Sequence, residues 1–267
     1  AEPRLKPYYI GQRKIITLMM KMDADLVVST LEDLENYYIK RSYIRKDIEY
    51  IYMCHHMTSM HMTGTKQEYD NYDTIMCVGP HQKAEIRAME KAYHTQKKKV
   101  PEIGYDLLDR EMADYEKMPH EKHERPIILI APSWNTDNIL DTCIDDMLSR
   151  LLGHGYHVIL RPHPEYVKRY RPRWEALVER YSKVSPDELT IEADFSGHGS
   201  ILESDVLITD WSTIAEEFSF TTLKPSLFID TPMKVINPDY EQVGITPTDI
   251  TLRNQIGRSL DPKDLSE

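Results

Sequence analysis

The stretch SDVLITDWSTIAEEF, at residues 204–218, contains a strand that ends at a polar corner and continues as a helix. The apolar run VLI at 206–208 has the length and β-branching of an internal parallel strand, and Asp210 closes it. A strand followed directly by a helix is the repeating unit of α/β proteins. The stretch therefore predicts an α/β fold with a parallel sheet.

The polar corner of this stretch fits two roles. Ser212 and Thr213 place short hydroxyl groups where the helix begins, and Glu216 and Glu217 follow in its first turns. The first N–H groups of a helix lack partners within it and the macrodipole is positive there, so an anion is stabilised. The corner is either an ordinary N-cap or a phosphate site, in which a glutamate reaches the ribose or only favours the helix start.

Composition excludes several classes of protein. The chain has 267 residues, 40% of them apolar, which is enough for two medium domains or one large one. Its 33 basic and 44 acidic side chains give a net charge of -11, which argues against a nucleic-acid partner. The three cysteines have no CxxC spacing, so neither a disulfide framework nor a zinc site is indicated, and a cytoplasmic setting fits best.

Membrane-spanning and secretory signals are not evident in this sequence. No run approaches the roughly 18 apolar residues that a membrane span requires, and the start shows no signal-peptide pattern. The segment KPYYIGQRKIITLMMKM, at 6–22, is basic and apolar and fits either an ordinary helix or a surface that contacts anionic lipid. We expect a soluble or peripheral chain.

Short apolar segments alternate with helix-length polar stretches, which indicates repeated βα units with helices on both faces of parallel sheets. The expected strands are DLVVST (25–30), IEYIYMC (48–54), DTIMCVG (73–79), PEIGY (101–105), IILIAPSW (127–134), GYHVILRPHPE (155–165), LTIEAD (189–194), DVLITD (205–210) and PSLFID (225–230). Between these strands, helices are expected over 139–152 and 174–181.

The pattern predicts two Rossmann-like domains. Residues 112–125 have no apolar face and form the best linker candidate, so we place the domains at 1–122 and 123–267. The second domain has a complete set of strands, whereas the first has about four candidates and no convincing opening strand. We therefore expect the N-terminal domain to be incomplete, with residues missing upstream of Ala1.

The segment RPHPE follows the expected strand HVIL directly. Arg161 and His163 thus lie at the carboxyl end of a parallel sheet, where open α/β folds bind ligands. An arginine and a histidine at that point can neutralise phosphate oxygens and donate a hydrogen bond to charge that develops in a transition state. The alternative is that His163 is a structural loop residue bonded to backbone.

Three histidines in CHHMTSMH, at 54–61, follow a strand of the first domain. A neutral histidine there can remove a proton from a hydroxyl nucleophile, and only one of His55 and His56 need do so. With His61 they can also be metal ligands, but no carboxylate or cysteine pattern completes a site. A third interpretation makes one of the adjacent pair a packed core residue.

Other strand ends carry weaker signals. His81 in VGPHQ either touches a substrate or caps a turn, Ser133 in APSW offers a donor before a helix, and Gly197 in SGHGS permits close approach of a nucleotide or only a tight turn. The sequence contains neither GKS or GKT nor GxGxxG, so a nucleoside triphosphate hydrolase and a dinucleotide dehydrogenase are disfavoured.

Taken in order, these motifs resemble the CDP-glycerol glycerophosphotransferase family of teichoic-acid polymerases. The resemblance runs from about residue 45 to the end of the chain and rests on the strand-end histidine, the GYxxLD turn, APSW, RPHPE, SDVLITDWSTIAEEF and KPSLFID. It is strongest in RPHPE and SDVLITDWSTI, where the family usually shows an HP pair and D-[YW]-S-[ST]. The family often has HG at the first histidine site, whereas this chain has HHM.

The resemblance implies a GT-B architecture, in which two Rossmann-like domains face each other across a cleft and the C-terminal one holds a CDP-linked donor. Such enzymes transfer a polyol phosphate to a hydroxyl at the end of a cell-wall or capsular polymer and release CMP. Position by position, His56 or His55 matches the base, His163 the histidine at the donor pyrophosphate, and Ser212 and Thr213 the hydroxyls at the phosphates.

Cations and helix dipoles can screen the pyrophosphate, so no metal cofactor is required by this site. Asp210 is the only obvious metal-ligand candidate, and it can instead orient the loop. The expected partners are the CDP-linked donor and a polymer or lipid-linked acceptor, and the latter favours a peripheral position on the cytoplasmic face of the membrane. The alternatives are another GT-B glycosyltransferase or a sugar-nucleotide epimerase with a UDP- or GDP-linked donor, or a non-catalytic nucleotide-binding module.

Overall fold

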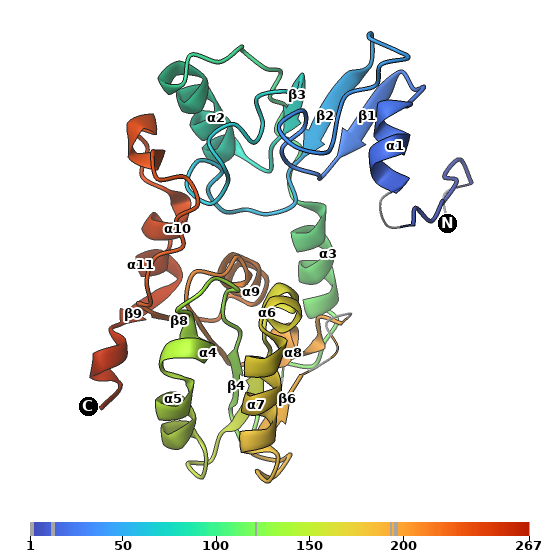
Figure 1. Cartoon of the computed structure of the whole chain (residues 1–267). Helices are drawn as coiled ribbons and strands as arrows, with labels where there is room; N and C mark the ends of the chain where they lie inside the picture. The colour runs from blue at the N-terminus through green and yellow to red at the C-terminus, as the bar shows by residue number, and fades with distance from the viewer. Residues whose placement is uncertain (1–2, 12–13, 121, 193, 195–196, 267) are drawn as a thin grey trace. The chain divides into compact units, whose positions relative to one another are not determined.

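The computed structural model describes residues 3–11, 14–120, 122–192, 194 and 197–266. The chain divides into two compact units, each with its own parallel sheet (Figure 1). The first unit comprises the residues up to Gly104 together with Ile236–Ile245, and the second comprises Tyr105–Val235 and the residues from Thr246 on. The α/β class with two parallel sheets is thereby confirmed.

A six-stranded sheet forms the centre of the second unit. Its order is β6-β5-β4-β7-β8-β9 and every neighbouring pair is parallel. The strands are β4 (Ile127–Ile130), β5 (His157–Leu160), β6 (Leu189–Ile191), β7 (Val206–Thr209), β8 (Ser226–Ile229) and β9 (Gly257–Leu260). From β4 the chain adds β5 and β6 on one side of the sheet, and it then adds β7, β8 and β9 on the other side of β4. This is the doubly wound Rossmann order. The order reverses between β4 and β7, which is where such sheets bind ligands.

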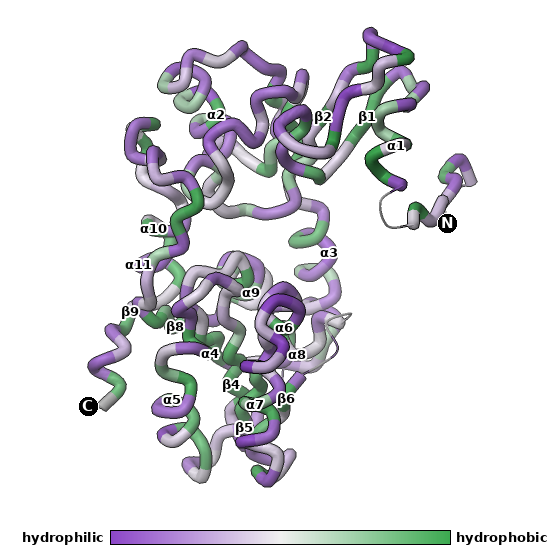
Figure 2. The backbone as a smooth tube through the Cα atoms, in the orientation of Figure 1, coloured by the Kyte–Doolittle hydropathy of each residue, from purple (hydrophilic) through white to green (hydrophobic). Residues whose placement is uncertain are grey.

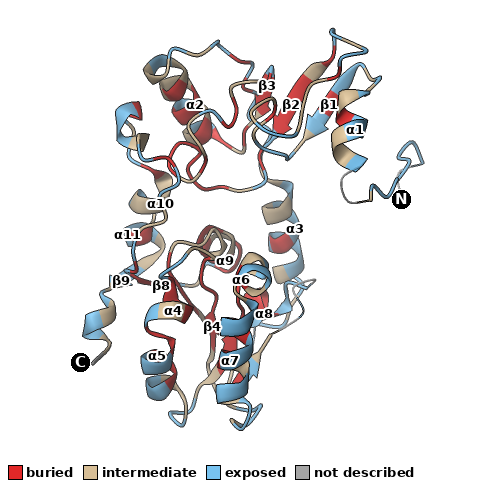
Figure 3. Ribbon diagram, in the orientation of Figure 1, coloured by how far each residue is buried: buried red, intermediate tan, exposed pale blue. Residues whose placement is uncertain are grey.

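Helices cover both faces of this sheet. They are α3 (Asp106–Tyr115), α4 (Ile139–Thr142), α5 (Ile144–Leu151), α6 (Pro164–Arg169), α7 (Arg171–Tyr181), α8 (Gly199–Glu203), α9 (Ile214–Thr222), α10 (Thr248–Thr251), α11 (Arg253–Ile256) and the 3₁₀-helix η2 (Pro262–Ser266). Along β4, Ile128 and Ile130 enter one hydrophobic core and Leu129 enters the other. The apolar strand sequences follow from this burial on both faces (Figures 2 and 3).

The first unit contains a smaller sheet of order β1-β2-β3, also parallel. Its elements are α1 (Lys14–Met20), β1 (Leu26–Ser29), β2 (Glu49–Met53), β3 (Thr74–Met76), α2 (Pro80–Ala92) and the 3₁₀-helix η1 (Tyr240–Val243). Tyr50 and Tyr52 of β2 are almost fully buried, and Val243 of the returning segment joins the same core. The 236–245 segment is therefore an integral part of this unit.

Several expectations from the sequence are corrected by the structure. The segment PEIGY is not a strand: it forms one isolated parallel bridge, between Glu102 and Cys77, since Pro101 has no N–H and Gly104 turns the chain at φ 79°. Residues 112–125 are not all linker, because α3 continues to Tyr115 and packs against α9. β9 was not predicted from its sequence, GRSL, which has no apolar run.

The division of the chain also falls earlier than the position near residue 122 that the sequence favours, because α3 belongs to the second unit. The expected helix over 139–152 is split at Cys143 into α4 and α5. Among the described residues, no helix has both the length and the apolar character that crossing a bilayer requires.

Candidate active site

The loops that follow β4 and β7 are joined by the buried carboxylate of Asp210. Its Oδ1 accepts hydrogen bonds from the backbone N–H groups of Ser133 and Trp211, both at 2.7 Å, and its Oδ2 accepts one from Ile139 N–H at 3.1 Å. Only 1% of the residue is exposed. Of the roles considered for Asp210, these contacts favour orientation of the loop. Ser133 is held by the same contact and is itself buried.

We expect Asp210→Asn to destabilise the second unit. An asparagine keeps one acceptor oxygen but turns an NH₂ group toward backbone donors, so at least one buried N–H group loses its partner. The expected loss is roughly 2–4 kcal/mol in the free energy of unfolding, measured by urea denaturation of the full chain. Asp230→Asn is the matched control: Asp230 is about half exposed and accepts from Arg253 at 2.6 Å, which an amide oxygen can also do. Equal stability of the two variants would contradict the assigned role of Asp210.

The corner at Ser212 and Thr213 has the backbone of a helix start without a side-chain cap. Thr213 is the N-cap residue of α9, with φ -62° and ψ -16°, and its side chain caps no N–H group. Both residues are half-buried. The ordinary N-cap interpretation is therefore not supported, and the positive end of the helix dipole lies at the switch point of the sheet, where it favours an anion.

His163 lies at the end of β5 and caps α6. Its Nδ1 accepts a hydrogen bond from the N–H of Glu165 at 3.1 Å, so in the neutral ring the proton is on Nε2. Burial, together with the charge of Lys234, lowers the pKa of His163 to about 4. At neutral pH the ring is therefore a neutral donor through Nε2, suited to hydrogen-bond an anionic oxygen but not to supply positive charge.

The guanidinium of Arg161 is hydrogen-bonded within the second unit. Its Nη1 donates to Glu192 Oε2 at 2.8 Å and to Ser200 Oγ at 3.0 Å, and its Nη2 donates to the carbonyl of Gly197 at 3.0 Å. The residue is 9% exposed. Arg161 thus links Glu192, Gly197 and Ser200 to the end of β5, and Gly197 takes part through its carbonyl. Ser196, the first residue of the SGHGS motif, lies outside the described residues.

The two glutamates of α9 are both in environments that favour the neutral acid. Burial and the nearby Asp249 raise the pKa of Glu216, whose Oε2 has no hydrogen-bond partner among the described residues. Burial and the nearby Glu111 raise the pKa of Glu217 to about 7, and Tyr105 Oη donates to its carboxylate at 3.1 Å.

Glu217 should make the stability of the second unit pH-dependent. Because its folded-state pKa is near 7 and its ordinary value is 4.5, the folded state binds more protons between these values and stability falls as pH rises through them. Glu217→Gln keeps an acceptor for Tyr105 and removes the titration. We expect the variant to gain up to about 3 kcal/mol over wild type in urea unfolding at pH 8, with little gain at pH 4.5. An equal difference at both pH values would contradict this assignment.

The adjacent histidines of the first unit follow β2. His56 is half-buried and its Nδ1 lies 2.9 Å from Thr58 Oγ1, whereas His55 is exposed and its Nδ1 lies 3.4 Å from Tyr52 Oη. When Nδ1–H of His56 donates to Thr58, Nε2 carries the lone pair that a base needs. Neither histidine is a packed core residue, contrary to the third interpretation from the sequence.

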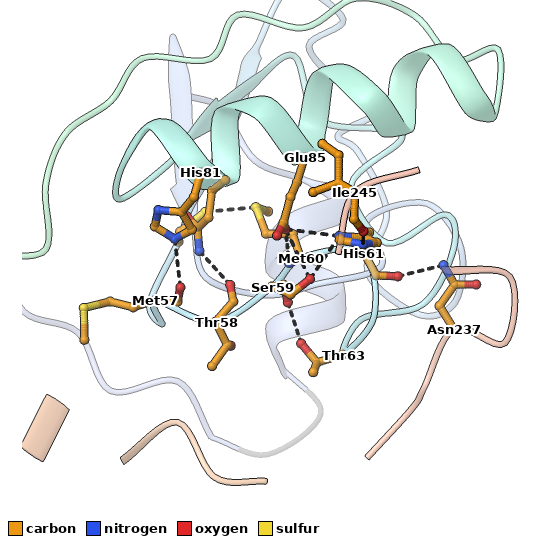
Figure 4. Close-up of polar contacts among 12 residues, drawn as sticks. Met57, Thr58, Ser59, Met60, His61, Thr63, His81, Glu85, Asn237 and Ile245 are labelled. Carbon is orange, nitrogen blue, oxygen red and sulfur yellow. Dashed lines mark hydrogen bonds and ion pairs between the residues drawn. The ribbon is translucent and has the colours of Figure 1, made fainter. Parts of the chain in front are cut away.

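The loop that carries these histidines is held by the first turn of α2. Gln82, which is fully buried, donates from Nε2 to the carbonyls of His56 at 2.9 Å and Thr58 at 3.1 Å. His81 Nε2 is 2.9 Å from the carbonyl of Met57, which can only accept, so the ring donates there (Figure 4). Through this contact, His81 holds in place the loop of residues 54–61, which we call the histidine loop.

A second set of contacts fixes the far end of the loop (Figure 4). The buried Glu85 Oε2 accepts from Met60 N–H at 2.7 Å and lies 3.3 Å from Nδ1 of His61. His61 is fully buried, with Nδ1 3.0 Å from Ser59 Oγ and Nε2 2.9 Å from the carbonyl of Ile245. His61 is therefore the packed histidine of this motif. Among described residues, no three His, Cys, Asp or Glu side chains are grouped to hold a metal ion.

The sequence matches a known family over most of its length. The family described as CDP-glycerol:poly(glycerophosphate) glycerophosphotransferase matches residues 23–235. No curated protein matches the chain at a significant level.

Similar solved structures share the fold. A UDP-GlcNAc 2-epimerase from Methanocaldococcus jannaschii, in complex with UDP-GlcNAc and UDP, is 13% identical with a TM-score of 0.58, over 95% of this chain and 70% of that one. The wall teichoic acid polymerase TagF is 18% identical with a TM-score of 0.47, over 78% of this chain and 53% of that one. The chain thus spans about half the length of that polymerase. Its two Rossmann-like units place it in the GT-B fold class.

Proposed function

Since the chain belongs to the CDP-glycerol:poly(glycerophosphate) glycerophosphotransferase family, we propose that it transfers glycerol phosphate or ribitol phosphate from a CDP-linked donor to a hydroxyl of a cell-wall or capsular polymer. The observation that supports this most is the switch point of the second sheet. An uncapped helix start at Ser212 and Thr213 and the neutral donor His163 follow strands of one parallel sheet. Both features suit phosphate oxygens.

The proposed reaction needs a base and a stabilised leaving group. His56 accepts the proton of the acceptor hydroxyl, whose oxygen attacks the phosphorus next to the polyol. The bond between that phosphorus and the bridging oxygen breaks, and CMP leaves with the bridging oxygen and its electron pair. We assign the proton transfer to the first unit and the binding of the donor phosphates to the second. A requirement for a divalent metal is not part of the proposal, and the rate in EDTA tests this point.

The experiment that tests the function measures CMP release. Full chain is supplied with CDP-glycerol or CDP-ribitol and a polyol-phosphate acceptor, and CMP is quantified by chromatography. Release that depends on the acceptor is expected. Binding of CDP without any CMP release would favour a non-catalytic module, and selective stabilisation by UDP or GDP in thermal unfolding would favour the other donors.

The proposals for the acceptor and the location are supported by the family match alone. We propose a lipid-linked polymer as acceptor, which would place the protein at the cytoplasmic face of the membrane. Co-sedimentation of the full chain with vesicles that carry the acceptor lipid, compared with vesicles that lack it, tests both proposals.

A further inference from the structure

Positive charge at the phosphate site does not come from the residues that the sequence favours. The guanidinium of Arg161 is bonded to Glu192, Ser200 and Gly197, and the ring of His163 is neutral at pH 7. Helix N–H groups contribute partial charges only. A phosphate monoester that leaves from a pyrophosphate gathers negative charge, so a full cation close to His163 would stabilise it.

Lys234 lies in the loop that follows β8 and comes close to His163. Its Nζ lies 5.1 Å from the ring centroid of Trp134, and the Trp134 and His163 ring centroids are 6.5 Å apart. Its charge is the next cause, after burial, that lowers the pKa of His163. The ammonium group and the imidazole thus lie beside the same indole ring and interact electrostatically.

The position of this loop is fixed from its other side. Trp211 Nε1, in the loop after β7, donates to the carbonyl of Thr231 at 2.9 Å. The guanidinium of Arg253 lies 4.1 Å from the Trp211 ring centroid and donates to the carbonyl of Asp210 at 2.8 Å. Lys234 is therefore carried by a loop that is braced against the same strand-to-helix corner as Ser212.

Arg169, the other cation at Trp134, is less suited to this role. Its Cζ lies 4.7 Å from the Trp134 ring centroid, but its side chain is 54% exposed on the surface of α6, where solvent screens its charge. Lys234 is half-buried, so its charge is screened less by solvent.

We propose that Lys234, held over the face of Trp134, is the cation of the diphosphate site and binds the phosphate oxygens of the CDP-linked donor together with His163. This inference rests on the proposed function for the identity of the donor, whereas the proposed anion site rests on the placement of Lys234 over Trp134 and of Trp134 beside His163. Trp134 is the residue whose ring positions the ammonium group.

The test compares four forms of the full chain: wild type, Lys234→Met, Lys234→Arg and Lys183→Met. Lys183 is an exposed lysine between α7 and β6, at the amino-terminal edge of the sheet, so its loss is a matched deletion of charge. Calorimetry with CDP and with inorganic pyrophosphate gives Kd for each form. We expect Lys234→Met to raise Kd for CDP and for pyrophosphate by roughly 10- to 100-fold. In Lys234→Arg and Lys183→Met, both Kd values should remain within about fivefold of wild type.

A second measurement is independent of the nucleotide. NMR titration of the His163 ring, assigned by its disappearance in His163→Asn, should show a higher pKa in Lys234→Met than in wild type. If the wild-type chain binds pyrophosphate in a Lys234-dependent way but does not bind CDP, the proposed donor is wrong and the anion site is retained. Wild-type-like binding of both ligands by Lys234→Met, or no binding of either by wild type, would overturn the inference.

Discussion

Replacement of His163 by asparagine is expected to slow CMP release by roughly 100- to 1,000-fold, the usual effect of removing one donor to an anionic transition state. The reason is geometric: Nδ1 is used by the N–H of Glu165, so Nε2–H is the group left to donate to a phosphate oxygen. Because the pKa of His163 is about 4, the ring stays neutral between pH 5 and 8 and the pH–rate profile in that range reports other groups. Initial rates at saturating donor measure the effect.

The choice of asparagine separates catalysis from stability. Asn is a favourable N-cap residue, so its side-chain oxygen can accept the bond from Glu165 N–H that the imidazole now accepts. His163→Asn should therefore unfold at nearly the same urea concentration as wild type, whereas His163→Ala should lose about 1 kcal/mol. A fully active His163→Asn would show that the histidine serves only as a helix cap.

The second large effect is expected for His56. His56→Ala should lower the rate by roughly 100- to 10,000-fold, since a general base is removed, and should abolish the rise of rate with pH near neutrality. His55→Ala should stay within about tenfold of wild type, because His55 is exposed and its Nδ1 is 3.4 Å from Tyr52 Oη, whereas Nδ1 of His56 is 2.9 Å from Thr58 Oγ1. Rates from pH 5 to 9 for both variants decide between the two residues.

Thr58→Val provides a further control on the same base. The substitution removes the hydroxyl that lies 2.9 Å from Nδ1 of His56 while the ring stays in place. We expect a smaller loss of rate than in His56→Ala, with the pH dependence retained but displaced. A normal rate in His56→Ala with a large loss in His55→Ala would transfer the role to His55.

The fold was largely predictable from apolar runs. The segments IILI, HVIL and VLIT are continuous because β4, β5 and β7 are buried on both faces, and this pattern survives in a single sequence. β9 was missed because it is an edge strand of sequence GRSL, whose pairing with β8 depends on Gly257. An alanine Cβ at Gly257 would lie 1.8 Å from the Ser226 carbonyl oxygen, a tertiary constraint that local pattern does not reveal.

The candidate site was predictable only in part. Residues at the carboxyl ends of neighbouring strands, such as Asp210 and Ser133, were expected at one edge, and they are hydrogen-bonded there. Partners that come from distant loops were not visible. The preference for Arg161 as the cation missed Glu192 and Ser200, and Lys234 reaches Trp134 from a loop that has no motif.

The burial of several polar residues was also not predictable from the sequence. Gln82 and Glu85 have the spacing and polarity of a solvated helix face, and only the structure shows that both are buried against the histidine loop. The same holds for His61, whose two ring nitrogens are used inside the first unit. Polarity alone therefore does not separate a surface residue from one that holds a loop in place.

The most direct test of the central claim, that the switch point of the second sheet binds the donor diphosphate, is a crystal structure of the full chain with CDP. We predict phosphate oxygens within about 3.2 Å of His163 Nε2 and of backbone N–H groups at the start of α9. A nucleotide bound elsewhere, with the edge between β4 and β7 empty, would contradict it.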